Sequence, residues 1–177
     1  MRVLGINAVF HDPAAALVVD GVTVAAAEEE RFTRRKHGKL PVPFSTWELP
    51  EKAAAWCLQR AGLSPADLDA VAYSYDPDLA PPYNPGDDIT AGDWEGLRTL
   101  YARRAPLFLR AALPGLDPGV VHFVPHHVAH AASAHLAAPY PRSSVLVLDG
   151  RGERGSHLAG RAVDGELEVL ATQELPH

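Results

Sequence analysis

The chain has 177 residues, of which 47% are hydrophobic and 21% are charged, a balance that excludes wholesale disorder and suits one domain or one domain with part of another. Its formal net charge of −6 argues against a nucleic-acid partner, because binding phosphates needs a basic face. The single cysteine, Cys57, excludes an internal disulfide and a cysteine-based zinc cluster.

No apolar run approaches the roughly 20 residues of a membrane span, and the first residues lack the basic and then apolar pattern of a secretory signal. A lone thiol is in keeping with a reducing compartment. We therefore expect no membrane partner and a cytoplasmic location.

Three strands are expected in the first thirty residues, over 2–9, 14–20 and 22–28. Asp20-Gly21 between the last two is a hairpin signal, because glycine adopts positive φ without strain. The elements expected next are a helix over 49–61, a strand over 69–75, a loop over 76–88, a helix over 94–112 that Pro106 should kink or break, a strand over 120–124 and a helix over 126–138.

A similar series of strands starts again near residue 143. Apolar runs over 144–149, 157–163 and 167–173 predict another meander, and Asp164-Gly165 repeats the hairpin signal. We therefore predict an α/β fold with internal duplication, in which residues 1–142 form one subdomain and residues 143–177 begin a second.

The strongest candidate for chemistry is the segment PHHVAH at residues 125–130. If it opens a helix, His126 and His130 share a face at the spacing that two imidazoles need to hold one metal, and His127 with His130 is the alternative pair. Equally, these histidines could only cap and solvate the helix start, since a metal site usually needs about four ligands.

A helix amino end carries partial positive charge, so a cation there needs a carboxylate nearby. Asp149 is the candidate, because it follows an apolar strand and ligands bind at such strand ends in open α/β sheets, although an aspartate before glycine also suits a plain turn. Mixed imidazole and carboxylate ligands favour Fe or Zn over Mg. The turn that follows, with Gly150, Arg151 and Gly152, could bind phosphate through backbone N–H groups or form a tight hairpin with solvated arginines.

Two further polar segments lie near the first strands. His11 could serve as a general base near neutral pH, although the neighbouring Asp12-Pro13 also suits a simple turn. After the third strand, the charge-dense stretch 28–37 fits either a solvated loop or an anion-binding lip in which Lys36 or an arginine reaches a phosphate.

Four stretches in sequence order resemble the O-carbamoyltransferase family of nodulation-factor and antibiotic biosynthesis: GINAVFHDPAAALVVDG, EEERFTRRKHGK, HHVAHAASA and VLVLDGRGE. The resemblance implies an actin-like, ribonuclease-H-like fold that begins with three antiparallel strands and is duplicated. It also implies that the chain holds only the amino-terminal part. The rest of a truncated second subdomain, with a further aspartate ligand, and a separate carboxyl-terminal domain would then lie elsewhere, on a longer chain or a partner chain.

The resemblance also implies a chemistry. Family members form a carbamoyl-adenylate from carbamoyl phosphate and ATP, and transfer its carbamoyl group to a hydroxyl of a sugar or other natural-product acceptor. By motif, the ligands of an Fe(II) or Zn ion fall on His126, His130 and Asp149, and His11, Asp12 and Lys36 fall at the transfer site. The alternatives are a non-catalytic remnant that binds a metal, a nucleotide or a partner, and an actin-like sugar kinase, whose cleft needs carboxylates rather than paired histidines.

Overall fold

In the computed structural model, the chain opens with the antiparallel meander that its sequence predicts. β1 (Arg2–Asn7) pairs with β2 (Ala14–Val19), and β2 pairs with β3 (Val22–Glu28), both antiparallel. Asp20 and Gly21 have φ values of 50° and 82°, as the two-residue turn between β2 and β3 requires. The predicted meander and its hairpin are confirmed.

The structure describes residues 1–38, 49–81 and 94–175. Contacts divide the chain into two units, each with its own sheet: one is Met1–Ser74 with Pro82–Phe123, and the other is Tyr75–Pro81 with Val124–His177. The subdomain boundary between residues 142 and 143 stays a prediction. The helix His126–Leu136 precedes that boundary in the sequence, but its contacts place it in the same unit as the second sheet.

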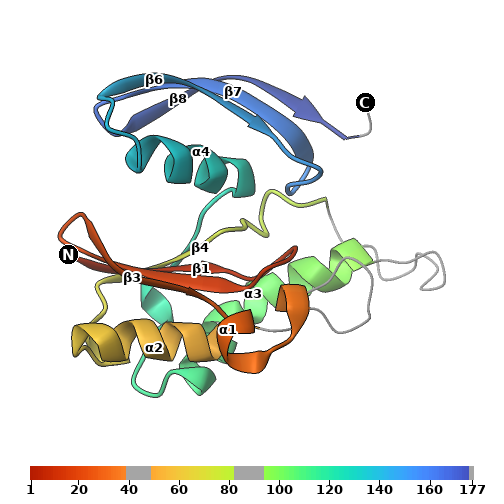
Figure 1. The fold of residues 1–177 in the computed structure, drawn as a ribbon. Helices are drawn as coiled ribbons and strands as arrows, with labels where there is room; N and C mark the ends of the chain where they lie inside the picture. Colours follow the sequence, from red (N-terminus) through yellow and green to blue (C-terminus); the bar gives the residue numbers. More distant parts are fainter. Residues whose placement is uncertain (39–48, 82–93, 176–177) are drawn as a thin grey trace. The chain divides into compact units, whose positions relative to one another are not determined.

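Two parallel strands complete the sheet of the first unit (Figure 1). β4 (Ala70–Tyr73) lies beside β1, and β5 (Val121–Phe123) lies beside β4, so the strand order is β3-β2-β1-β4-β5. Because β1 and β4 are parallel, their carboxyl ends meet at one edge of the sheet, which brings Asn7 close to Ser74.

Alternate residues of these strands form the core of the first unit. Leu4 of β1 and Leu17 of β2 are directly paired and are fully buried. α2 (Glu51–Ala61) packs on β2 and β3 and buries a face of small residues, among them Cys57. It ends at Gly62, which adopts the left-handed conformation expected of a helix stop.

α3 (Trp94–Ala112) continues through Pro106, so of the kink or break expected at that residue the break is wrong, and the kink stays a prediction. Proline removes one backbone N–H from the helix, but Ala102, Ala105 and Leu109 around it are at most 1% exposed, and this packing holds the helix together. Within the described residues, no helix is both long and apolar enough to cross a membrane.

The second unit repeats the antiparallel meander. β6 (Arg142–Leu148), β7 (Gly155–Val163) and β8 (Glu166–Glu174) form a three-stranded sheet in sequence order. α4 (His126–Leu136) packs on β6 and β7 (Figure 1), over a core of Ala131, Val145, Val147, Leu158 and Ala162. The loop between β6 and β7 therefore follows directly on a strand that α4 covers.

Candidate functional site

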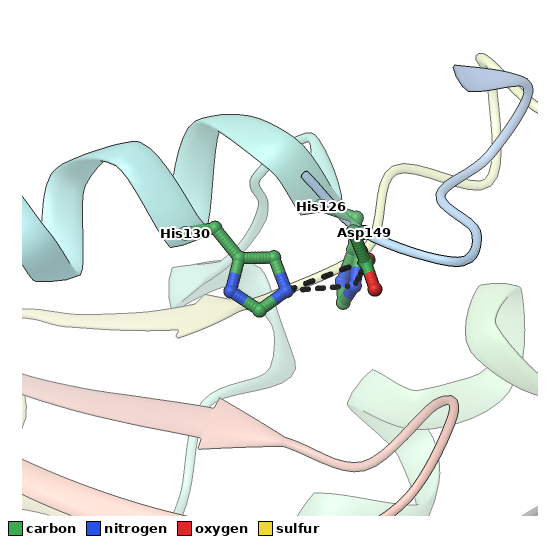
Figure 2. Close-up of side chains that lie close together, drawn as sticks. All are labelled: His126, His130 and Asp149. Carbon is green, nitrogen blue, oxygen red and sulfur yellow. Dashed lines mark hydrogen bonds and ion pairs between the residues drawn. The ribbon is translucent and has the colours of Figure 1, made fainter. Parts of the chain in front are cut away.

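The start of α4 and the end of β6 bring three of the predicted residues together (Figure 2). His126 is the first residue of α4 and His130 lies one turn further, so both imidazoles project from one side and lean toward the amino end of the helix. Nε2 of His126 lies 3.1 Å from Oδ2 of Asp149 and 3.1 Å from Nε2 of His130. Nε2 of His130 lies 3.6 Å from the same oxygen of Asp149.

These separations fit a shared metal ion. Imidazole nitrogens and carboxylate oxygens bind zinc at about 2.0–2.2 Å, so ligand atoms around one ion lie roughly 2.8–3.6 Å from one another, for angles at the ion between a right angle and a tetrahedral one. Two of the three separations here are 3.1 Å, and all three ligand atoms lie within 4.8 Å of one another. Two imidazoles with one carboxylate are a donor set that Fe or Zn binds better than Mg.

His127 takes a different direction from its neighbours. Its ring centroid lies 6.5 Å from that of His130, against 4.6 Å for His126. The imidazole packs on the glycine-rich turn, where a Cβ atom on Gly152 would lie 3.1 Å from its Cε1 and Nε2 atoms. Its buried Nε2 lies 3.5 Å from Oδ2 of Asp149 and makes no hydrogen bond with any residue that the structure describes. The sequence left the partner of His130 open, and the structure brings His126 to it.

Asp149 keeps its negative charge at this site. Burial pushes its pKa upward, but the N–H of Gly150, which donates to Oδ1 over 2.7 Å, and the neighbouring imidazoles bring the pKa below its ordinary value. Burial prevails at His127, whose pKa is lowered despite the charges of Asp149 and Glu153. An ionised carboxylate has lone pairs to offer a cation.

Gly150, Arg151 and Gly152 form the turn that the sequence suggested for phosphate binding. The N–H of Gly150 is donated to the side chain of Asp149, and the N–H of Gly152 is donated to the carbonyl oxygen of Gly155 over 2.7 Å. Both N–H groups are thus used within the turn, while Arg151 is exposed. Phosphate binding here stays a prediction, and it would depend on the Arg151 guanidinium.

Glu153, in the same turn, is a residue to which the sequence assigned no role. Its side chain is buried, and its Oε1 atom accepts the backbone N–H of His126 over 2.9 Å and that of Asp76 over 2.7 Å. α4 follows Pro125, which has no side-chain cap to offer, so Glu153 supplies the acceptor from elsewhere in the chain. No local pattern indicates this contact, because the two partners lie 27 and 77 residues away.

The carboxyl end of β1 leads to a second polar cluster. Nδ1 of His11 lies 2.7 Å from Oδ2 of Asp12, and Nδ1 of His37 lies 2.9 Å from Oδ1. Partial burial raises the pKa of Asp12, but the hydrogen bonds from His37 and His11 outweigh it and leave the pKa below its ordinary value. His37 had no assigned role, and it belongs to the short 3-10 turn Lys36–Gly38, in which Lys36 is exposed.

Backbone contacts hold this second cluster in place. The side-chain amide of Asn7 donates to the carbonyl oxygens of His11 and Asp12, both at 3.0 Å. Its own Oδ1 accepts the hydroxyl of Ser74 over 3.1 Å. Asp12 and His37 both have left-handed backbones, with φ of 50° and 59°, and the N–H of Asp12 donates to the carbonyl oxygen of His37. Strained backbones of this kind persist only where the surroundings fix them.

Residues 2–81 match the family model described as Carbamoyltransferase N-terminus. In this range the chain is similar to the amino-terminal domain of carbamoyltransferases. It is 33% identical to Nodulation protein NolNO of Sinorhizobium fredii over 175 residues, which cover 94% of this chain and 23% of that protein. It is 35% identical to Uncharacterized protein sll1178 of Synechocystis sp. over 167 residues, which cover 86% of this chain and 26% of that protein. The chain thus spans about a quarter of the length of these relatives, and the resemblance predicted from the sequence is confirmed.

Solved structures are similar in fold. YeaZ from Pseudomonas aeruginosa matches with a TM-score of 0.52 at 15% identity, over 98% of this chain and 66% of that chain. A second crystal structure, of an uncharacterized protein with similarity to peptidase YeaZ from the same organism, has the same TM-score and identity, over 96% of this chain and 63% of that chain. At this identity the likeness shows the fold alone. The actin-like, ribonuclease-H-like fold predicted from the sequence is confirmed.

Proposed function

We propose that this chain is the amino-terminal, acceptor-side part of an O-carbamoyltransferase, which moves a carbamoyl group from carbamoyl-adenylate to a hydroxyl of a small acceptor. The convergence of His126, His130 and Asp149, in a chain whose residues 2–81 match the family model described as Carbamoyltransferase N-terminus, supports this most directly. An Fe(II) or Zn ion held by these residues would supply a Lewis acid for the adenylate. Carbamoyl phosphate and ATP would be used by a further domain, on a longer chain or a partner chain.

In the transfer step, the acceptor oxygen forms a bond to the carbamoyl carbon, and the bond from that carbon to the adenylate phosphate oxygen breaks. AMP leaves with the bonding electron pair, and His11 takes the hydroxyl proton. With Nδ1–H of His11 donated to Asp12 over 2.7 Å, the lone pair on Nε2 is the one that accepts it. Asp12 then stabilises the imidazolium that forms, and the Lys36 ammonium would attract an anionic oxygen of the donor.

Metal binding by the chain itself tests the centre. We expect calorimetric titration with Zn²⁺, or with Fe²⁺ without oxygen, to show one ion per chain. His130→Ala removes a ligand and should weaken binding by about 100-fold or more. His122→Ala is the control, because that side chain is exposed on β5. A wild-type chain that binds neither ion would rule out the centre.

Carbamoyl transfer tests the rest of the proposal. The chain is combined with a carboxyl-terminal fragment of a relative, labelled carbamoyl phosphate, ATP and a panel of hydroxyl acceptors. We expect label in the acceptor, and His11→Asn should abolish it while leaving Zn²⁺ binding unchanged. ATP-dependent phosphorylation of a sugar without carbamoyl transfer would favour the kinase instead.

A further inference from the structure

We propose that Glu153 is a positioning residue of this metal centre: it anchors the first residue of α4 and offsets the positive charge of the helix amino end, so that His126 and His130 can hold a cation. This inference rests on the proposed metal centre. Glu153 is not one of the three residues whose ligand atoms converge, so its role is separate from ligation.

The position of the histidines creates the need for such a residue. Both belong to the first two turns of α4, where unpaired backbone N–H groups give the helix end about half a positive charge. A divalent ion at this end is repelled by it. Asp149 brings one negative charge, and Pro125 brings none, so a second carboxylate at the helix end makes the position more favourable for a cation.

The contacts of Glu153 give that carboxylate a fixed place. Oε1 accepts the N–H of His126 over 2.9 Å, and the side chain is buried with 9% exposure, so water screens its charge poorly. Glu153 and Asp149 belong to the same turn, which is closed by the N–H of Asp149 donating to the carbonyl oxygen of Ser156 over 2.9 Å. The bond from His126 to Glu153 therefore ties the helix that carries two ligands to the turn that carries the third.

A matched control exists in the other unit. α2 also follows a proline, Pro50, and has no side-chain cap of its own. The buried carboxylate of Glu29 accepts the N–H groups of Ala53 and Lys52 over 2.8 and 3.3 Å. Glu29 is thus a helix cap of the same chemical kind, on a helix that carries none of the proposed ligands.

Zn²⁺ affinity of the 177-residue chain, measured by calorimetry, tests the inference. Glu153→Gln keeps an acceptor for His126 and removes only the charge, and we expect it to weaken Zn²⁺ binding roughly 10-fold or more. Glu29→Gln should change the affinity by less than about twofold. Unchanged affinity in Glu153→Gln, or an equal loss in Glu29→Gln, overturns the role of Glu153 and leaves the centre standing. Absence of binding in the wild type overturns both.

Amide exchange in the wild type provides a second measurement, independent of whether the variants fold. The N–H of the first residue of a helix ordinarily has no partner and exchanges quickly. We expect the amide of His126 to be protected at least 10-fold over an open amide, because Glu153 accepts it. Exchange of the His126 amide at the open rate would overturn the anchoring contact.

Discussion

Replacing Gly160 by alanine should loosen the second sheet, because the new Cβ atom would lie 2.6 Å from the backbone carbonyl oxygen of Glu168. Close carbon–oxygen contacts between strands are about 3.3–3.6 Å, so β7 and β8 would have to separate by roughly 0.7 Å or more. Forcing packed elements apart costs about 1–3 kcal/mol, and each ladder hydrogen bond lost adds about 1 kcal/mol. The lower chain entropy of alanine returns about 0.4–1 kcal/mol, so the clash prevails by roughly 1–3 kcal/mol.

Hydrogen exchange followed by mass spectrometry reads this effect locally. A loss of about 1.4 kcal/mol is tenfold in an equilibrium, so protection over 155–174 should fall roughly 10- to 100-fold in Gly160→Ala. Gly150→Ala is the matched control: it has no atom within 4 Å of the added Cβ and no positive φ, and should stay within about 0.5 kcal/mol of wild type. Equal protection in the two variants would refute the reasoning.

Three further changes give outcomes that can be checked. His37→Ala should raise the pKa of Asp12 in a carboxyl NMR titration, and an unmoved pKa would contradict the pairing. Because the pKa of Asp12 is lower in the folded chain, the stability that this contact adds is present above the unfolded pKa near 4 and is lost as the pH falls through the folded pKa. Gly152→Ala should push the His127 ring by a few tenths of an ångström and lower stability by about 1 kcal/mol, with unchanged His127 ring resonances as the opposing result. Leu158→Ala, at a position 3% exposed, should cost about 2–5 kcal/mol in a urea titration, and a cost below 1 kcal/mol would show that this core repacks.

Much of the fold could be predicted because its signals are local. Alternation in β1, the turn residues Asp20 and Gly21 and the stop at Gly62 each act over a few residues of sequence. The failures involve distant partners. Glu29 lies in a charge-dense segment that was expected to form a solvated loop or an anion-binding lip, yet it is only 2% exposed. Its carboxylate caps α2 by accepting the N–H of Ala53, which lies 24 residues away in the sequence.

The candidate site divides in the same way. The spacing of His126 and His130, and an acid after an apolar strand, could be found by pattern. Pattern alone could not predict whether His126 or His127 turns toward His130, because residues three and four apart can both share a helix face. In the structure the ring of His127 packs over Gly152, in the turn after β6, and His126 is the one that faces His130. The pairing of His37 with a carboxylate 25 residues earlier likewise depends on a turn that periodicity does not show.

Geometry and electrostatics favour opposite ends of a helix for a histidine pair that binds a cation. At the carboxyl end the dipole attracts the ion, but side chains lean back toward the amino end and would project over the helix body, away from ligands beyond it. At the amino end the two imidazoles project past the helix and meet Asp149, against about half a positive charge. With a divalent ion and Asp149 alone the local charge is about +1.5, and Glu153 lowers it to about +0.5. A second buried carboxylate, which accepts the first N–H of the same helix, thus lets the geometrically suitable end become electrostatically suitable as well.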